Sequence, residues 1–331
     1  MNVTHVLKTI FVLVFIFASI SSYACKILTG PSSATDRYDA VAYVGDWSMP
    51  RDKAVGSEQS TSVNTAGQIG VLCNWNIEIR TTASVVGGKL VPGYSNVYET
   101  GIPGIGIQYL ATAPGMPSKS MKAAPFEYIY NDILRSNELI SAVKLIVVGP
   151  VKSGSVSGSV LPTLRWVITQ NNISSIYTIR VAGSLNITGK TCSIGNSASE
   201  VSLAPISIGE LKSIGSTSGG KNFSINLNSC PAGMNVFITV TDATNPSNLS
   251  SALSLTRDSG AKGIGFQVYR GSTPVNFGPD SSSIGNTNQW FVGSTYNGNI
   301  NIPLSVRYLK TSNSVKAGTA NGRMSFTLSY Q

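Results

Sequence analysis

Short apolar segments separated by turn residues run along the whole chain, and this pattern most constrains the fold. Glycine pairs and proline–glycine pairs recur between the segments, and only 12% of the 331 residues are charged. The segments are rich in β-branched and aromatic residues and have the length of strands. The pattern predicts an all-β protein and makes a helical one unlikely. Because a domain holds about 150 residues, we expect two domains.

The first 24 residues have the composition of an export signal. A charged start with Lys8 precedes an apolar run at 10–20, and small residues at Ser22 and Ala24 precede Cys25. The run is too short to span a bilayer, so a membrane anchor is the less favoured alternative. We predict cleavage directly before Cys25 or one or two residues earlier, and export of the remaining chain.

Histidine is absent from the predicted mature chain, because His5 lies in the signal. Without histidine the chain lacks the base of a Ser-His-Asp mechanism and a common zinc ligand. The mature chain carries 23 basic and 15 acidic residues, and the basic ones are scattered. These features exclude most secreted hydrolases and disfavour nucleic-acid binding. We expect no metal and no cofactor.

The cysteines fall into two separated pairs, and an even number in an exported chain indicates disulfide bonds. Nested or crossed bonds would tie distant halves of the chain together, so we expect Cys25–Cys73 and Cys192–Cys230. One bond then lies in each domain. We predict a signal at 1–24, a first domain at 25–181 and a second domain at 182–331.

Strands are expected throughout both domains. The strand-like segments of the first domain are 75–80, 106–110, 143–148 and 164–169, and those of the second are 222–227, 236–241, 263–269, 300–308 and 322–330. The segment 126–140 fits a helix as well as a strand, because its apolar residues are near helical spacing. Both alternatives stay open for that segment.

Five motifs follow one another in the second domain. They are Thr191-Cys192 with Cys230-Pro231, the strand 263–269, residues 301–304 leading to Tyr308, Gly318 with Gly322, and the end of the chain at 326–331. In this order the motifs resemble the pilin domain of chaperone–usher fimbriae. The resemblance implies an incomplete immunoglobulin-like sandwich that lacks its last strand.

The resemblance also implies partners. A periplasmic chaperone fills the groove left by the missing strand, the outer-membrane usher assembles the fibre, and an adjacent pilus subunit later donates a strand. The final segment alternates Met324, Phe326, Leu328 and Tyr330 on one face. We expect these four residues to form the edge that the chaperone and the donor strand contact.

The predicted start at Cys25 leaves no segment that could serve as a donor strand. A subunit that accepts a strand and donates none is expected at the fimbrial tip, on the cell surface. Two-domain tip adhesins carry a lectin domain in front of the pilin domain. The first domain, which begins with Cys25 and Lys26, is similar to such lectin domains, and we expect an immunoglobulin-like or jelly-roll-like sandwich.

The similarity to the type 1 fimbrial adhesins implies one set of sugar-binding residues. Asn74 and Asn76 follow the second cysteine, and Gln170 and Asn172 lie in a loop rich in glutamine and asparagine. In that family, an asparagine after the second cysteine and the loop both contribute to the sugar pocket. The acidic residue that follows the loop in the family is missing here, so mannose is not implied.

Residue chemistry suggests a second set of sugar-binding residues. A sugar offers hydroxyl groups that need hydrogen-bond partners and an apolar face that stacks on an aromatic ring. Asp46, Trp47 and Arg51 combine these types in one segment. Packing of Trp47 in the core and solvated charges are the alternative reading.

We therefore expect a fimbrial tip adhesin that binds a host-cell glycan or glycoprotein. One alternative is a structural tip or initiator subunit without glycan binding. Another is a glycosidase, for which Asp46 with Asp52 or Asp36 with Asp39 could form a carboxylate pair. No spacing fixes either pair across a scissile bond, so we predict that the protein is not an enzyme.

Overall fold

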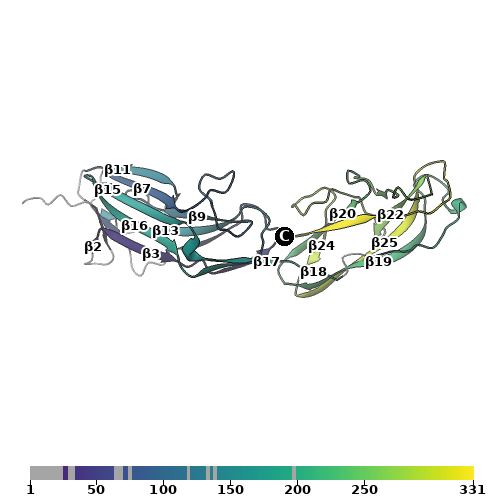
Figure 1. The fold of residues 1–331 in the computed structure, drawn as a ribbon, viewed down its shortest axis with the longest axis horizontal. Helices are drawn as coiled ribbons and strands as arrows, with labels where there is room; N and C mark the ends of the chain where they lie inside the picture. The colour runs from purple at the N-terminus through teal and green to yellow at the C-terminus, as the bar shows by residue number, and fades with distance from the viewer. Residues whose placement is uncertain are drawn as a thin grey trace, which may run out of the picture.

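The computed structural model describes residues 25–28, 34–62, 70–73, 77–117, 120–131, 135–136, 140–195 and 199–331. Within these ranges the regular elements are β-strands and two short 3-10 turns, η1 (Gly158–Val160) and η2 (Ile208–Glu210). They form two β-bodies that lie end to end (Figure 1). The predicted all-β class is confirmed. No helix in the described ranges is long and apolar enough to cross a membrane.

The first body contains two larger sheets and two smaller ones. One larger sheet has the order β11 (Phe126–Tyr130), β7 (Ile79–Val86), β15 (Thr163–Gln170), β16 (Ile173–Val181) and β3 (Arg37–Ala42). The other has the order β10 (Lys122–Ala123), β9 (Ile105–Ala111), β13 (Ser141–Val147) and β5 (Glu58–Ser62), with β8 (Tyr98–Glu99) beside β9. The smaller sheets are β12 (Arg135–Ser136), β6 (Gly70–Leu72), β1 (Lys26–Leu28) and β2 (Ala34–Thr35), and β14 (Gly154–Ser157), β17 (Ser184–Lys190) and β4 (Asp46–Pro50).

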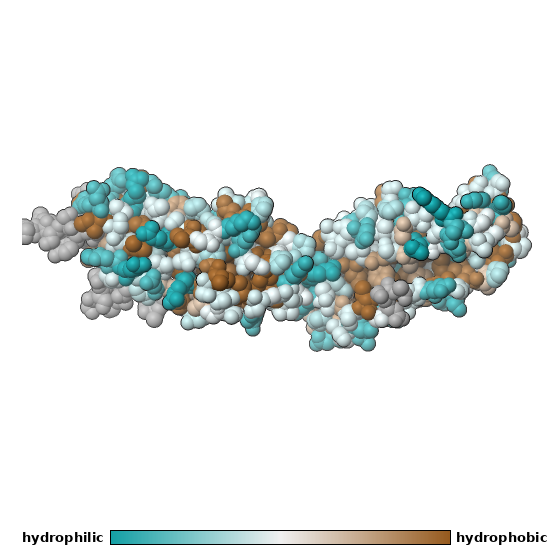
Figure 2. All heavy atoms as spheres, viewed as in Figure 1, coloured by the Kyte–Doolittle hydropathy of each residue, from teal (hydrophilic) through white to brown (hydrophobic). Residues whose placement is uncertain are grey.

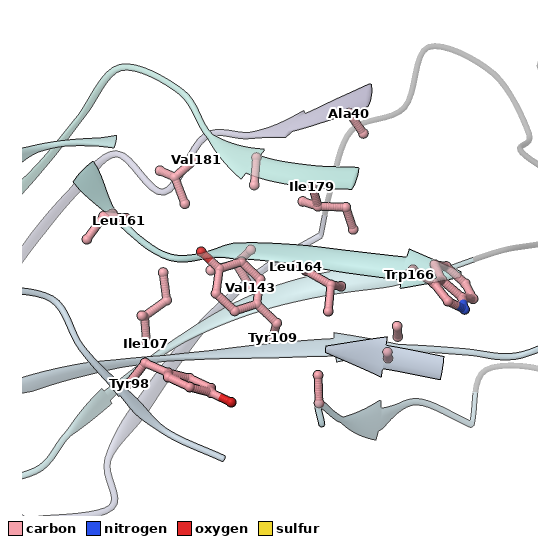
Figure 3. Packing of buried hydrophobic residues seen from close by; sticks show 14 of the residues in the cluster. Ala40, Tyr98, Ile107, Tyr109, Val143, Leu161, Leu164, Trp166, Ile179 and Val181 are labelled. Atoms are coloured by element: carbon pink, nitrogen blue, oxygen red, sulfur yellow. The ribbon is translucent and has the colours of Figure 1, made fainter. Parts of the chain in front are cut away.

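The core of the first body lies between the two larger sheets. In β15, Leu164 and Trp166 are fully buried whereas Arg165 between them is exposed, because successive side chains of a strand point to opposite faces. Leu164 lies beside Tyr109 of β9 and Val143 of β13 (Figure 3), and Trp166 is part of the same core. The ring of Trp166 also contacts Tyr177 of β16 edge-on, with centroids 5.4 Å apart.

The second body is a sandwich of a large and a small sheet. The large sheet has the order β18 (Ser193–Ile194), β19 (Thr217–Cys230), β25 (Gly298–Lys310), β22 (Ile264–Arg270) and β21 (Ala252–Leu253), with β23 (Thr273–Pro274) beside β22. The small sheet has the order β24 (Trp290–Ser294), β20 (Asn235–Asp242) and β26 (Met324–Tyr330). Buried residues of both sheets, such as Phe266, Ile238 and Leu328, form one core.

Both predicted disulfide bonds are present. Cys25 is bonded to Cys73 in the first core, and Cys192 is bonded to Cys230 in the second core. No cysteine in the described ranges is free. Each bond therefore closes a loop within one body, as the separated pairs in the sequence indicate.

The change from one core to the other occurs later than the predicted boundary after residue 181. β17 pairs in parallel with β4 of the first body, and its residues Leu185 and Ile187 are buried in the first core. Cys192 is the first residue of the second core. We propose that the boundary between the two cores lies between Ile187 and Cys192.

Residues 126–140 begin with a strand. β11 pairs antiparallel with β7, and Glu127 and Ile129 are exposed while the aromatic residues alternating with them are half-buried. A period of two is that of a strand, so the helical alternative is wrong for this part of the segment. Residues 132–134 and 137–139 lie outside the described ranges.

Candidate binding and assembly sites

Two of the predicted sugar-binding residues lie on β4. The parallel pairing of β4 with β17 places Asp46 opposite Asn186, whose Nδ2 donates a hydrogen bond to Asp46 Oδ1 at 2.8 Å. The Asp46 side chain is exposed. The Trp47 ring is half-buried and packs against the first core. Trp47 therefore contributes to packing, while Asp46 lies on the surface.

Arg51, predicted in the same group, lies where the two bodies meet. Its Nη2 donates a hydrogen bond to the Leu328 carbonyl at 2.7 Å, and its guanidinium lies 5.0 Å from the centre of the Tyr330 ring. Both residues belong to β26 of the second body. The structure gives Arg51 a contact between the domains, which differs from the predicted sugar contact beside Trp47.

Gln170 and Asn172 lie at the turn between β15 and β16, at the end of the first body that faces away from the second (Figure 1). Gln170 is 1% exposed, its Oε1 lies 3.8 Å from Cys25 Sγ, and its Nε2 donates to the Ile77 carbonyl at 3.4 Å. Asn171 and Asn172 have φ values of 50° and 61°, which asparagine tolerates in two-residue hairpin turns. Gln170 thus packs against the disulfide, whereas Asn172 is exposed.

The other two predicted residues, Asn74 and Asn76, lie outside the described ranges. Asn74 directly follows Cys73, whose bond to Cys25 lies beside Gln170. Among the described residues, the predicted sugar-binding residues form two groups. Gln170 and Asn172 lie at the end of β15 and in the turn after it, whereas Asp46, Trp47 and Arg51 lie on β4 or directly after it.

The four residues of the predicted strand-accepting edge share one face of β26. Leu328 and Tyr330 are buried, Met324 and Phe326 are half-buried, and all four pack on the second core. β26 pairs with β20 on one side, and within residues 199–331 no strand pairs with its other side. A band of hydrophobic residues runs along the second body (Figure 2). The open side of β26 therefore combines unpaired backbone with an apolar face.

Asp52 is buried between the two bodies. From the sequence it is only a possible partner of Asp46 in a carboxylate pair. Asp52 is 8% exposed. Its Oδ2 accepts a hydrogen bond from the Tyr330 amide at 2.9 Å, and its own amide donates to the Tyr330 carbonyl at 3.0 Å. The one available signal in the sequence is the charged triplet 51–53 in a chain that is poor in charge.

A second buried carboxylate, Asp242, holds a loop of the second body. It is fully buried and accepts hydrogen bonds from the backbone amides of Thr244, Asn245 and Ser254 at 2.9, 3.1 and 3.0 Å and from Asn248 Nδ2 at 2.9 Å. Burial raises the pKa of this carboxyl, but the hydrogen bonds outweigh burial and hold the pKa below its ordinary value. The network is closed, so it indicates a structural role.

The described ranges contain no group of three or more histidine, cysteine, aspartate or glutamate residues that could hold a metal ion. Burial raises the pKa of the tyrosines Tyr98, Tyr109 and Tyr177. Burial raises the pKa of Tyr330, while the Cys192 carbonyl and Arg51 act in the opposite direction. These tyrosines pack in the two cores.

Comparison with known proteins shows what the second body is similar to. The family model described as "Fimbrial protein" matches residues 180–331. The F17a-G fimbrial adhesin of Escherichia coli is 43% identical over 150 residues, which are 44% of this chain and 43% of the relative. The chain thus matches less than half the length of that relative.

Other relatives align over more of the chain. The fimbria adhesin protein of Klebsiella pneumoniae is 28% identical over 298 residues, covering 84% of this chain and 87% of the relative. The crystal structure of the CupB6 tip adhesin from Pseudomonas aeruginosa has 15% identity and a TM-score of 0.37, covering 92% of this chain and 93% of that one. The receptor binding domain of the adhesin MrkD1P of Klebsiella pneumoniae has 19% identity and a TM-score of 0.34, covering 51% of this chain and 99% of that one.

The family model and the sequence relatives agree with the motifs of the second domain and with its sandwich fold. Fimbrial adhesins are exported to the cell surface, as the signal at 1–24 predicts for this chain. Residues 180–331 therefore match the fimbrial protein family model, and the chain as a whole is similar to fimbrial adhesins.

Proposed function

We propose that the protein is the adhesin at the tip of a fimbria. The first body binds a host-cell glycan or glycoprotein, and the second body anchors it to the fibre. The observation that carries the proposal is the combination of a fimbrial protein domain with a separate, independently cored β-body in front of it. Adhesin names among the relatives support the same function.

Anchoring takes place at the open side of β26. The edge of a sheet offers unpaired N–H and C=O groups to an extended segment of another chain. The apolar residues Met324 and Phe326 are half-buried here, so an added strand would bury them further. A periplasmic chaperone supplies this strand before assembly through the usher, and an adjacent pilus subunit supplies it in the fibre.

The anchoring proposal predicts that an added strand stabilises the second body. We consider a strand of alternating threonine and valine joined after Gln331 through a flexible glycine–serine linker. It should raise the unfolding temperature of the second body by more than about 5 °C in scanning calorimetry, since each kcal/mol is worth a few degrees in a domain of this size. The control strand carries serine in place of valine. Equal unfolding temperatures for both strands would contradict anchoring at this edge.

Receptor binding takes place at the end of the first body that faces away from the second. Asn172 is exposed there on a hairpin turn, and the Cys25–Cys73 disulfide lies beside Gln170 at the same end. Amide groups can donate and accept at once, which suits the paired hydroxyls of a sugar. Distance from the fibre also favours this end, because it is the part of a tip subunit that first meets a cell surface.

This assignment predicts that Asn172→Gly weakens glycan binding by about tenfold or more, the effect of losing one or two hydrogen bonds. Glycine keeps the positive φ of the turn and removes the amide. Binding is measured for the full chain, complemented with the strand, on a glycan array. Asp46→Ala on β4 is the matched surface control, expected to bind as well as the wild type. Loss of binding in Asp46→Ala alone would move the site to β4.

A structural tip or initiator subunit is the second candidate function. It predicts that the complemented chain binds neither glycans nor host proteins. An enzymatic role has less support, because the two carboxylates of one suggested pair, Asp46 and Asp52, have separate partners. Asp46 is bonded to Asn186 on the surface, whereas Asp52 is buried against Tyr330.

A further inference from the structure

The open edge of β26 has a defined set of backbone groups. Asn235 and Gln331 exchange both of their backbone hydrogen bonds, at 2.8 and 2.9 Å. In an antiparallel pair such exchange recurs at every second residue, so the residues between have N–H and C=O groups pointing away from the partner strand. The residues whose backbone groups point away from β20 are therefore Met324, Phe326, Leu328 and Tyr330.

Three of these outward groups, at one end of the strand, are already bonded to the first body. The Tyr330 amide donates to Asp52 Oδ2 at 2.9 Å, and the Tyr330 carbonyl accepts from the Asp52 amide at 3.0 Å. The Leu328 carbonyl accepts from Arg51 Nη2 at 2.7 Å. Arg51 and Asp52 thus occupy the positions that the first residues of a neighbouring strand would fill.

The two residues that make these contacts are held in place from several sides. Arg51 Nη2 and Nε pair with the Asp52 carboxylate at 2.7 and 3.0 Å. The Arg51 amide donates to the Lys190 carbonyl at 3.1 Å, and its carbonyl accepts from the Val151 amide at 2.9 Å. Ser282 Oγ lies 3.4 Å from Asp52 Oδ1. Such a paired arginine and carboxylate form strong, directional hydrogen bonds.

We infer that Arg51 and Asp52 form a stop at one end of the strand-accepting edge. An incoming strand pairs with Met324, with Phe326 and with the Leu328 amide, and it ends there. Displacing the stop would leave the buried Asp52 carboxylate without its Tyr330 donor, which costs more than the new strand bond returns. The first body therefore sets the register of the strand that anchors the second. The inference rests on the proposed anchoring at this edge.

The test compares two appended strands of alternating threonine and valine in the full chain. The shorter strand begins opposite Leu328, and the longer one has two more residues that reach Tyr330. In the wild type the extension should leave the unfolding temperature of the second body unchanged. In Asp52→Ala the extension should raise it by about 2–4 °C, the shift expected for one additional kcal/mol in a domain of this size. Lys53→Ala, an exposed neighbour, is the control and should behave as the wild type.

Amide hydrogen exchange by NMR gives a second readout on the same proteins. With the shorter strand, the Tyr330 amide should be protected in the wild type and should exchange about tenfold to a hundredfold faster in Asp52→Ala, as the loss of a hydrogen bond to a charged group implies. Two results would contradict the stop. One is that the longer strand raises the unfolding temperature of the wild type as much as that of Asp52→Ala. The other is that the Tyr330 amide is equally protected in the wild type and in Asp52→Ala. If neither appended strand protects the Phe326 amide from exchange, the proposed anchoring at this edge is wrong. In that case, protection of the Tyr330 amide that is lost in Asp52→Ala would still support the contact between the two bodies.

Discussion

Replacing Asp242 with alanine is expected to lower the free energy of unfolding of the second body by roughly 3–5 kcal/mol. The buried carboxylate accepts hydrogen bonds from three backbone amides and the Asn248 side chain. Alanine removes the acceptor shared by these four partly buried donors, and each hydrogen bond lost to a charged acceptor costs about 1–3 kcal/mol before the loop relaxes. Urea unfolding of the full chain with the appended strand measures the loss. Glu200→Ala changes an exposed carboxylate of the same body and should alter stability by no more than about 0.5 kcal/mol.

The same carboxylate predicts a dependence on pH. Its pKa is lowered in the folded state, so its stabilisation is fully present above the unfolded aspartate pKa of about 3.9 and is lost as the pH falls through the lower folded value. The stability difference between the wild type and Asp242→Ala should therefore be constant near neutral pH and should shrink below about pH 4. A difference that stays constant down to pH 3 would show that the carboxylate charge does not support the loop.

Replacing Trp166 with alanine is expected to lower the stability of the first body by about 3–5 kcal/mol, the range for removing a large aromatic side chain from a core. Trp166 is fully buried between the two larger sheets and contacts Tyr177 edge-on. Among the described residues its Nε1 has no hydrogen-bond partner, so the loss comes from packing. Scanning calorimetry of the full chain should show a lower transition for the first body and an unchanged one for the second.

Two variants test the cause of this loss. Trp166→Phe keeps an aromatic ring and should lose less than half as much stability as Trp166→Ala. Arg165→Ala changes the next residue of β15, whose side chain is exposed, and should have little effect. If Arg165→Ala and Trp166→Ala were equally destabilising, burial between the sheets would not explain the role of Trp166.

Much of the fold could be predicted from the sequence because the signals are local. β-Branched and aromatic residues in segments of strand length predicted β15 and β22, and alternation of apolar and polar residues predicted β26. The two cysteine pairs predicted the disulfides, because each pair closes a loop within one body. The sequence did not decide between a helix and a strand for the segment 126–140, because the spacing of its apolar residues fits both. The pairing of β11 with β7 shows that the segment begins with a strand.

The candidate site was harder to predict than the fold. Gln170 and Asn172 are two positions apart, yet one is packed against the first disulfide and the other is exposed on a turn. Trp47 has the residue type of a sugar platform but packs on the core. Residue type predicts what a side chain can bind. Whether a ligand can reach the side chain depends on burial, which the neighbouring strands determine.

By itself, the sequence determined that the chain is all-β, has two domains with one disulfide each, and ends in a strand with one apolar face. These properties follow from periodicity and from covalent closure of short loops, which act over a few neighbouring residues or one body. Only the tertiary structure decided the role of Arg51 and Asp52, whose partners Leu328 and Tyr330 lie 277 and 278 positions away. A contact over that distance depends on how two folded bodies meet, and no local pattern encodes it.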